Sequence, residues 1–161
     1  MRTKILWIIL TIVFIGCNEH IIYRNYINLG ESWTFNKKVR FDIENFLAGE
    51  QNEFNIYIHL RNNNEYQYSN IFLIATLKDS INILEKDTLE YAMANSEGQW
   101  LGRGFLGLKE SKLWWKKKYN FPSGNLIICE IEQVIRRNGE EFPDKELKGI
   151  VDVGFSIERA K

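Results

Sequence analysis

The stretch FNIYIHLR, residues 54–61, alternates apolar and more polar residues at every position. Successive side chains of a β-strand point to opposite faces of its sheet, so this period of two predicts a half-buried strand with one face in water. The same alternation occurs in VRFDIENF (39–46) and in VDVGFSIE (151–158). A fourth stretch, NIFLIATL (70–77), is apolar on both faces and therefore predicts a central strand.

Further strands are predicted at residues 81–93, 112–121 and 125–135, with turn-forming residues between them. No stretch shows a helical period over three turns. Short strands at regular spacing, separated by turn signals, favour an antiparallel sandwich. The sequence therefore predicts an all-β fold, a single antiparallel β-sandwich of Ig-like or jelly-roll-like type, over residues 31–161.

The N-terminus, MRTKILWIILTIVFIGC, has the order of parts of a secretory signal peptide. Two basic residues precede an apolar run over residues 5–15, which is shorter than the roughly 20 residues that span a bilayer. Cys17 follows Gly16 directly and resembles the acylated cysteine of a bacterial lipobox, although Phe14 stands where that motif usually has leucine. We therefore predict a signal peptide over residues 1–16, and a lipidated Cys17 with a tether over residues 17–30. An ordinary signal peptide that happens to carry a cysteine is the alternative.

Removal of residues 1–16 takes away two of the 21 basic residues and none of the 21 acidic ones. The remaining chain therefore has 19 basic and 21 acidic residues and a net charge of −2. This balance gives no reason to expect nucleic-acid binding. Cys129 lies on the same alternating face as two isoleucines in LIICEIEQ, which predicts a small buried apolar side chain rather than a catalytic thiol.

Two features resemble catalytic motifs. GRGFLG (102–107) spells the glycine pattern of a dinucleotide-binding loop, but that loop needs a following helix, and the sequence after it reads as loop and strand. Glu130 and Glu132 could form the carboxylate pair of a glycosidase, or the solvated face of a strand. Neither His20 nor His59 has further ligands at metal-binding spacing. We predict no catalytic residue, cofactor or metal.

Trp114 and Trp115 are adjacent, so one should point into the sandwich and the other outward. We favour a covered tryptophan; an outward tryptophan beside Tyr119 that stacks on a sugar or a partner protein is the alternative. The lysines at 116–118 are typical of a protected edge strand.

Several short motifs stand in a recognisable order. They are an Arg-Asn pair with a following E-Y-x-Y-x-N, a D-T pair, G-x-W-L-G-x-G, I-E-Q-x-x-R and G-I-x-x-V-G. In this chain they occupy Arg61, Asn62, Glu65, Tyr66, Tyr68, Asn70, Asp87, Thr88, Gly98, Trp100, Leu101, Gly102, Gly104, Ile131, Glu132, Gln133, Arg136, Gly149, Ile150, Val153 and Gly154. In their order and spacing these motifs resemble the gliding-motility lipoprotein GldH family of the Bacteroidetes.

The resemblance implies a non-enzymatic lipoprotein of the cell envelope, anchored in the outer or inner membrane through Cys17 and facing the periplasm. It also implies partners among the gliding-motility proteins linked to type IX secretion, and no small-molecule substrate. Loops on a rigid scaffold often carry function, so loop 61–70 and the glycine-rich region 98–107 form the candidate interaction surface. Its residues are Arg61, Asn62, Glu65, Tyr66, Tyr68, Trp100 and Arg103. The alternative is an envelope lipoprotein that binds or processes carbohydrate, which requires exposed indoles in an open groove beside carboxylates.

Overall fold

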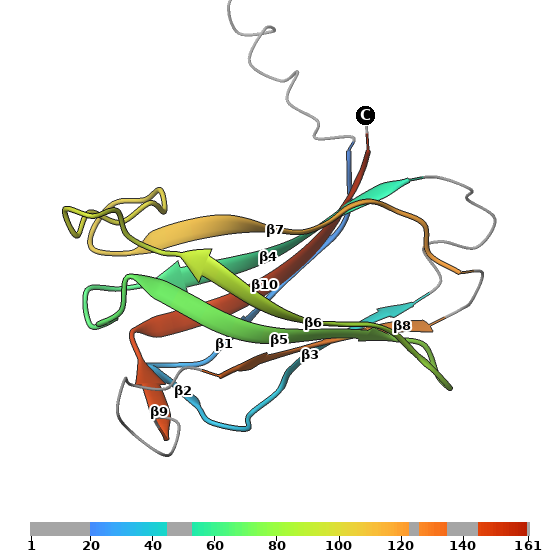
Figure 1. Ribbon diagram of the computed structural model, residues 1–161, viewed down its shortest axis with the longest axis horizontal. Helices are drawn as coiled ribbons and strands as arrows, with labels where there is room; N and C mark the ends of the chain where they lie inside the picture. The colour runs from blue at the N-terminus through green and yellow to red at the C-terminus, as the bar shows by residue number, and fades with distance from the viewer. Residues whose placement is uncertain (1–19, 45–52, 123–125, 135–144, 161) are drawn as a thin grey trace, which may run out of the picture.

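The computed structural model describes residues 20–44, 53–122, 126–134 and 145–160, and these residues form ten strands and no helix (Figure 1). The prediction of an all-β fold is thereby confirmed. The predicted signal peptide and Cys17 lie outside the described residues.

In the described chain, two antiparallel sheets of four strands form the two layers of a sandwich (Figure 1). The first sheet has the order β1 (Ile21–Asn28), β10 (Ile150–Arg159), β4 (Phe54–Asn62) and β7 (Lys109–Tyr119). The second has the order β3 (Val39–Glu44), β8 (Leu126–Gln133), β5 (Asn70–Lys78) and β6 (Ile83–Ala92). A short ribbon pairs β2 (Ser32–Thr34) with β9 (Glu146–Lys148).

The pairing pattern decides between the two predicted types of sandwich. Strand β1 pairs with β10, β3 with β8, β4 with β7 and β5 with β6. These are the pairs that arise when one long antiparallel hairpin, with its turn between β5 and β6, is rolled into two layers. This is the arrangement of a jelly roll.

The two ends of the sandwich carry different parts of the chain. At one end, here called the terminal end, β1 begins and β10 finishes, and the Arg159 backbone N–H donates to the carbonyl of His20 at 2.8 Å. At the other, the loop end, Asn62 of β4 pairs with Ile150 of β10. Eight residue steps along β4 separate these ends, about 26 Å. Connections 63–69 and 93–108 lie at the loop end, and the β5–β6 hairpin lies at the terminal end (Figure 1).

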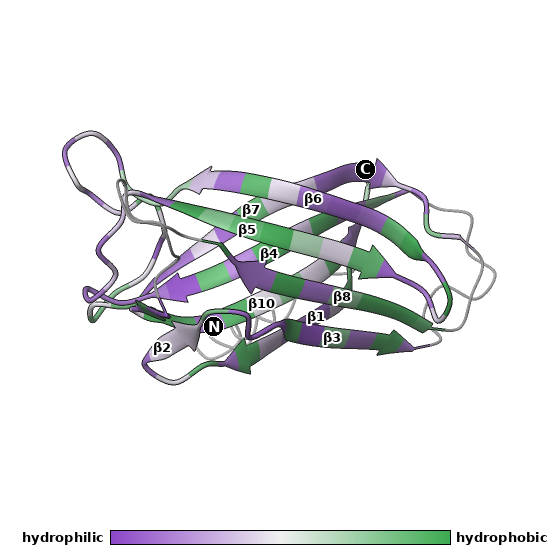
Figure 2. Ribbon diagram, turned by 60° about the horizontal axis from the view of Figure 1, so that its bottom comes forward, coloured by the Kyte–Doolittle hydropathy of each residue, from purple (hydrophilic) through white to green (hydrophobic). Residues whose placement is uncertain are grey.

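Large apolar side chains fill the space between the sheets. Strand β3 alternates strictly between buried and exposed residues, as its sequence predicts. Its Phe41 stacks on Phe155 of the opposite sheet with ring centroids 5.7 Å apart. Figure 2 shows the same alternation of hydrophobic and hydrophilic residues along β3. Strand β5 pairs on both sides, which confirms its predicted central place.

The prediction of a wet face on β4 and β10 is wrong. Tyr57 and His59 of β4, and Ser156 of β10, are buried although they point away from the core. The reason is that both strands are interior strands of their sheet, and long side chains from the edge strands lie over them. The Tyr26 ring lies so close to Gly154 that a Cβ there would be 2.6 Å from it.

The prediction of a tether over residues 17–30 is wrong for residues 21–28, which form the edge strand β1. They pair with β10 over most of its length, and Tyr23 packs against Phe155 at 6.1 Å. Ile22, Tyr23 and Ile27 of this strand pack against the core, whereas its Arg24, Tyr26 and Asn28 lie over the outer face of the first sheet. The folded domain therefore begins close behind Cys17.

Candidate functional site: the loop end

Two connections lie next to each other at the loop end. A shallow hollow is lined by Asn63, Asn64 and Glu65 of the first connection and by residues 106–108 of the second connection. This arrangement brings together the two segments that the sequence predicted as a contact surface.

Tyr66 holds the first connection in place from its buried side. Its ring is buried, its hydroxyl donates to the carbonyl of Asn70 at 2.7 Å, and burial raises the pKa of the phenol. Gly149, at φ 82°, passes so close that a Cβ there would overlap the backbone of Tyr66. Trp100 of the second connection packs against the Tyr66 ring at 6.0 Å. One buried tyrosine therefore holds both connections in place.

The second connection is closely hydrogen-bonded. The backbone groups of Arg103 and Glu110 exchange two hydrogen bonds of 2.8 Å, and the Lys109 ammonium donates to the carbonyl of Gly104 at 2.8 Å. Gly104 adopts φ 152°, and a Cβ there would overlap the carbonyl of Leu108. Such a network presents the residues between 104 and 108 in a fixed position.

These residues expose large apolar side chains. Phe105 is 80% exposed and Leu106 is 95% exposed, and Leu101 and Leu108 beside them are 55% and 38% exposed. We call these four residues the apolar loop tip. Contiguous exposed apolar side chains on a rigid loop are typical of a protein–protein or membrane contact.

The structure places the predicted surface residues in different environments. Glu65 and Arg103 are exposed at the loop end, and Tyr68 and Trp100 are half-buried. Asn62 and Tyr66 are buried, so these two support the surface but are not part of it. Arg61 lies on the outer face of the first sheet, where Glu110 and Asp152 bind it. The most exposed apolar residues, Phe105 and Leu106, were not singled out, although two large apolar residues between glycines (GFLG) are a recognisable signal.

A buried polar cluster lies on the outer face of the first sheet. His59 Nε2 is 2.8 Å from Ser156 Oγ, and His59 Nδ1 is 3.5 Å from Glu110 Oε1. The Tyr26 hydroxyl donates to the same carboxylate at 2.6 Å, and Arg61 Nε donates to its other oxygen at 2.8 Å. Serine, histidine and glutamate in this order are also the residues of a hydrolytic triad.

Burial argues against hydrolytic chemistry here. Ser156 is 0% exposed and His59 is 1% exposed, so a substrate carbonyl cannot reach the hydroxyl. The distance from His59 Nδ1 to the carboxylate is too long for a hydrogen bond, and this nitrogen has no hydrogen-bond partner among the described residues. Burial opposes ionisation of Glu110, but its hydrogen bonds from Tyr26 and Arg61 lower its pKa. We interpret the cluster as a polar clasp that joins β1, β4, β7 and β10.

The other candidate catalytic features of the sequence, GRGFLG, Glu130 and Cys129, lie in surroundings that do not suit catalysis. GRGFLG leads into β7, so it lacks the helix N-terminus of a dinucleotide site. Glu130 accepts a hydrogen bond from Lys78 at 2.6 Å, which lowers its pKa, whereas a glycosidase acid needs a raised one. Cys129 is buried, as predicted, and burial raises the pKa of its thiol.

The tryptophans meet only part of what the carbohydrate-binding alternative requires. Trp115 points inward and donates to Asp87 at 2.8 Å, and Trp114 points outward, as predicted for the pair. Trp114 is 45% exposed although its ring packs on Tyr57 with centroids 4.3 Å apart, so the prediction of a covered tryptophan is wrong for Trp114. Trp100 is half-buried against Tyr66. The three indoles do not gather in one open groove beside carboxylates.

Within the described ranges, no three His, Cys, Asp or Glu side chains are grouped so that they could hold a metal ion. The same residues include no helix long and apolar enough to cross a membrane. The described residues form a small all-β domain with a jelly-roll topology and an apolar loop tip, and in the sequence this domain follows a lipobox-like N-terminus.

Comparisons with known proteins identify the family. The family described as GldH lipoprotein matches residues 21–157. A gliding motility lipoprotein GldH homolog from Christiangramia forsetii is 38% identical over 155 residues, 96% of this chain and 94% of that protein. A gliding motility lipoprotein GldH from Flavobacterium johnsoniae is 34% identical over 161 residues, 99% of both chains. The chain belongs to the GldH lipoprotein family, which confirms the resemblance in its motifs.

Among solved structures, the crystal structure of dimeric latent PorU from Porphyromonas gingivalis matches 90% of this chain and 14% of the PorU chain. The sequence identity is 11% and the TM-score is 0.37. A similarity of this size carries no conclusion about fold or function.

Proposed function

We propose that the protein is a non-enzymatic accessory component of the gliding-motility machinery linked to type IX secretion. Acylated Cys17 holds it at a membrane of the cell envelope, facing the periplasm, and the loop end contacts other envelope proteins of that machinery. The observation that carries this proposal is the apolar loop tip, because Phe105 and Leu106 are exposed on a loop that is fixed by hydrogen bonds.

The position of this tip supports a contact role. The described chain starts at the terminal end, and the tip lies at the opposite end of the sandwich (Figure 1). A domain anchored near its first strand would therefore present the tip away from the anchor. Exposed aromatic and aliphatic residues of this kind act as anchors in the centre of protein interfaces.

The test separates anchoring from contact in the bacterium that produces the protein. Three tagged variants are compared with the wild type: Cys17→Ala, the double variant Phe105→Ser/Leu106→Ser, and the control Lys86→Ser/Thr88→Ser on the exposed face of β6. Membrane fractionation, colony spreading and co-purifying proteins are measured for each.

We expect Cys17→Ala to leave the membrane fraction and to abolish spreading. We expect the loop-tip variant to stay in the membrane fraction but to lose spreading and its co-purifying envelope proteins, because its contact residues are polar. The control should behave as the wild type. Normal spreading and unchanged partners of the loop-tip variant would refute the contact role, and an unchanged membrane fraction of Cys17→Ala would refute the anchor.

A further inference from the structure

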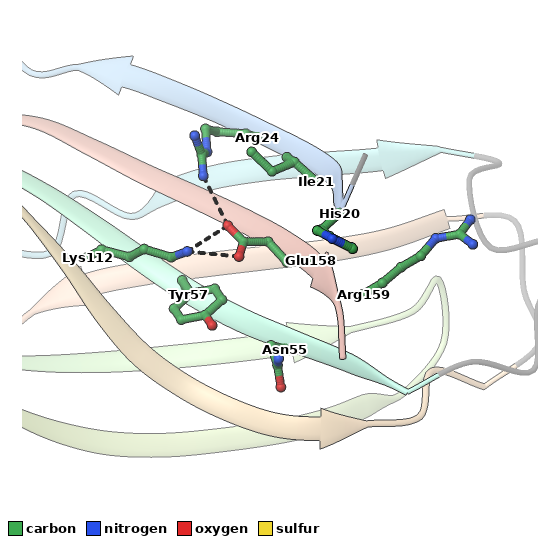
Figure 3. Close-up of a pocket in the computed structure, with 8 residues that line it drawn as sticks. All are labelled: His20, Ile21, Arg24, Asn55, Tyr57, Lys112, Glu158 and Arg159. Atoms are coloured by element: carbon green, nitrogen blue, oxygen red, sulfur yellow. Dashed lines mark hydrogen bonds and ion pairs between the residues drawn. The ribbon is translucent and has the colours of Figure 1, made fainter. Parts of the chain in front are cut away.

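A second feature lies at the terminal end, on the outer face of the first sheet. It is a hollow of about 390 Å³ with Tyr57 in its wall (Figure 3). Arg24 of β1 and Lys112 of β7 reach into it from opposite sides, and Glu158 of β10 lies between them. His20, which precedes β1, and Arg159, the last residue of β10, also line the hollow.

The ion pairs in this hollow hold two cations close together. Arg24 Nη2 is 3.0 Å from Glu158 Oε1, and Lys112 Nζ is 2.8 Å from both oxygens of the same carboxylate. The Lys112 ammonium also lies 3.9 Å from the centre of the Tyr57 ring. Because Glu158 is shielded at 14% side-chain exposure, it reduces the repulsion between the two cations and fixes their direction. The cations are therefore arranged before any ligand binds.

The hollow retains donors and positive charge for a ligand. Within the described part of the chain, Arg24 uses one guanidinium nitrogen, for Glu158, which leaves Nε and Nη1 for a further acceptor. Arg24 and Lys112 carry two positive charges against the one carboxylate of Glu158, which leaves these three side chains with a net charge of +1. An anion with several acceptor oxygens fits this arrangement, and phosphate is one that arginine and lysine commonly bind in proteins.

The hollow lies close to the proposed anchor, and this step rests on the proposed function. His20 is three residues after Cys17, and three extended residues span at most about 10 Å. The headgroup region of a bilayer is roughly 5–8 Å deep on each side. An acyl chain on Cys17 would therefore bring the hollow within reach of the headgroups around it.

A separate observation on the second sheet points to the same surface. The β5–β6 hairpin, also at the terminal end, carries Ile81 at 89% exposure and Ile83 at 64%. Exposed isoleucines at a hairpin tip are suited to the boundary between headgroups and acyl chains. Lys117, exposed near the end of β7, adds positive charge at this end, whereas the neighbouring Lys118 is paired with Glu53 at 3.4 Å. Both sheets thus offer membrane-compatible groups on the side of the anchor.

We propose that the hollow binds the phosphate of an anionic phospholipid headgroup in the leaflet that holds the anchor. Arg24 and Lys112 donate to the phosphate oxygens, and Glu158 keeps the two side chains in position. The bound headgroup, together with Ile81, fixes the terminal end on the bilayer and directs the apolar loop tip away from it.

The test uses the acylated full-length mature protein in a non-ionic detergent, with lipid binding measured by native mass spectrometry. The probes are phosphatidylglycerol, phosphatidylcholine and inorganic phosphate. We expect phosphatidylglycerol to bind about tenfold more tightly than phosphatidylcholine, since only the former has a net negative headgroup. Inorganic phosphate at equal concentration should not displace it. Equal binding of the two lipids, or displacement by inorganic phosphate, would overturn the proposal.

Three variants sharpen the test. Arg24→Gln/Lys112→Gln should weaken phosphatidylglycerol binding about tenfold, while Arg40→Gln/Lys86→Gln removes the same charge from the second sheet and should leave it unchanged. Glu158→Gln keeps a side chain of the same shape whose amide oxygen can still accept a hydrogen bond from one of the two cations, but it removes the competing negative charge, so it should strengthen binding. A purely structural role predicts weaker binding for Glu158→Gln as well as for the double variant, and that result would refute the site.

The mass of the denatured protein reports the acyl chains on Cys17 independently of bound lipid. A protein that is acylated but shows no preference for phosphatidylglycerol would refute the headgroup site and leave the anchor intact. A protein without acyl chains would refute the anchor of the proposed function, and the headgroup site, which depends on that anchor, would fall with it.

Discussion

The buried imidazole of His59 should make the protein less stable in mild acid. Burial lowers the pKa of His59 to about 4, and the charges of Arg24 and Lys112 act in the same direction, whereas Glu110 and Glu158 oppose them. In the unfolded chain a histidine titrates near ~6.5. Between these two values the unfolded chain binds a proton that the folded chain does not. The free energy of unfolding must therefore fall as the pH falls through this window.

The size of the effect follows from the two pKa values. Proton linkage gives a loss of about 2 kcal/mol between pH 7 and pH 5, rising to about 3 kcal/mol near pH 4. His59→Gln removes the titrating group and keeps an amide that can face Ser156. The variant should lack this part of the pH dependence, although it is less stable at pH 7.

Urea unfolding at pH 7, 6 and 5, followed by the fluorescence of the buried tryptophans Trp33 and Trp115, measures this difference. Carboxylates with lowered pKa, such as Glu130, also lose their stabilising effect in acid, but they do so in both proteins. The difference between wild type and variant therefore isolates the histidine. Parallel curves of stability against pH for the two proteins would show that His59 titrates normally and that its burial is not as described.

Three further predictions concern the interior. Gly149→Ala should lower the free energy of unfolding by about 3 kcal/mol or more, because φ is 82° and the new Cβ would overlap the backbone of Tyr66. Gly30→Ala is the control: its φ is 81°, but no atom lies within 4 Å of the new Cβ, so it should cost much less in the same urea assay. Trp115→Phe should lower the free energy of unfolding by about 1–2 kcal/mol, since it leaves the Asp87 carboxylate without its indole donor. A smaller loss, measured by thermal unfolding, would contradict that hydrogen bond. Cys129 should resist a thiol reagent until denaturant is added, because it is fully buried, and rapid native labelling would disagree with its place in the core.

Alternation along the sequence predicted the strands well, because that signal is local. The buried and exposed residues of β3 follow its sequence letter by letter, and Cys129 is buried on the face that its neighbours predict. Adjacent tryptophans had to point in opposite directions, and they do. Each of these predictions depends only on the period of a strand.

Predictions that depend on distant residues were less successful. The outer positions of β4 are buried because Tyr26 and Trp114, from two edge strands, lie over them, and no local pattern encodes this. The local sequence predicts a tether where β1 lies, because the partners of β1 in β10 come more than a hundred residues later. At the loop end the motif residue Tyr66 proved to be a buried support, since its burial depends on Gly149 from another part of the chain.

Site-specific photocrosslinking in living cells tests the central claim most directly. A photoreactive amino acid is placed at Leu106 in the apolar loop tip and, as a control, at Thr88 on the exposed face of β6. The account predicts that Leu106 forms a discrete adduct with another envelope protein and that Thr88 does not. A chain that forms its adduct from Thr88, and none from Leu106, would contradict the account, because the contact surface would then lie on the second sheet and not at the loop end.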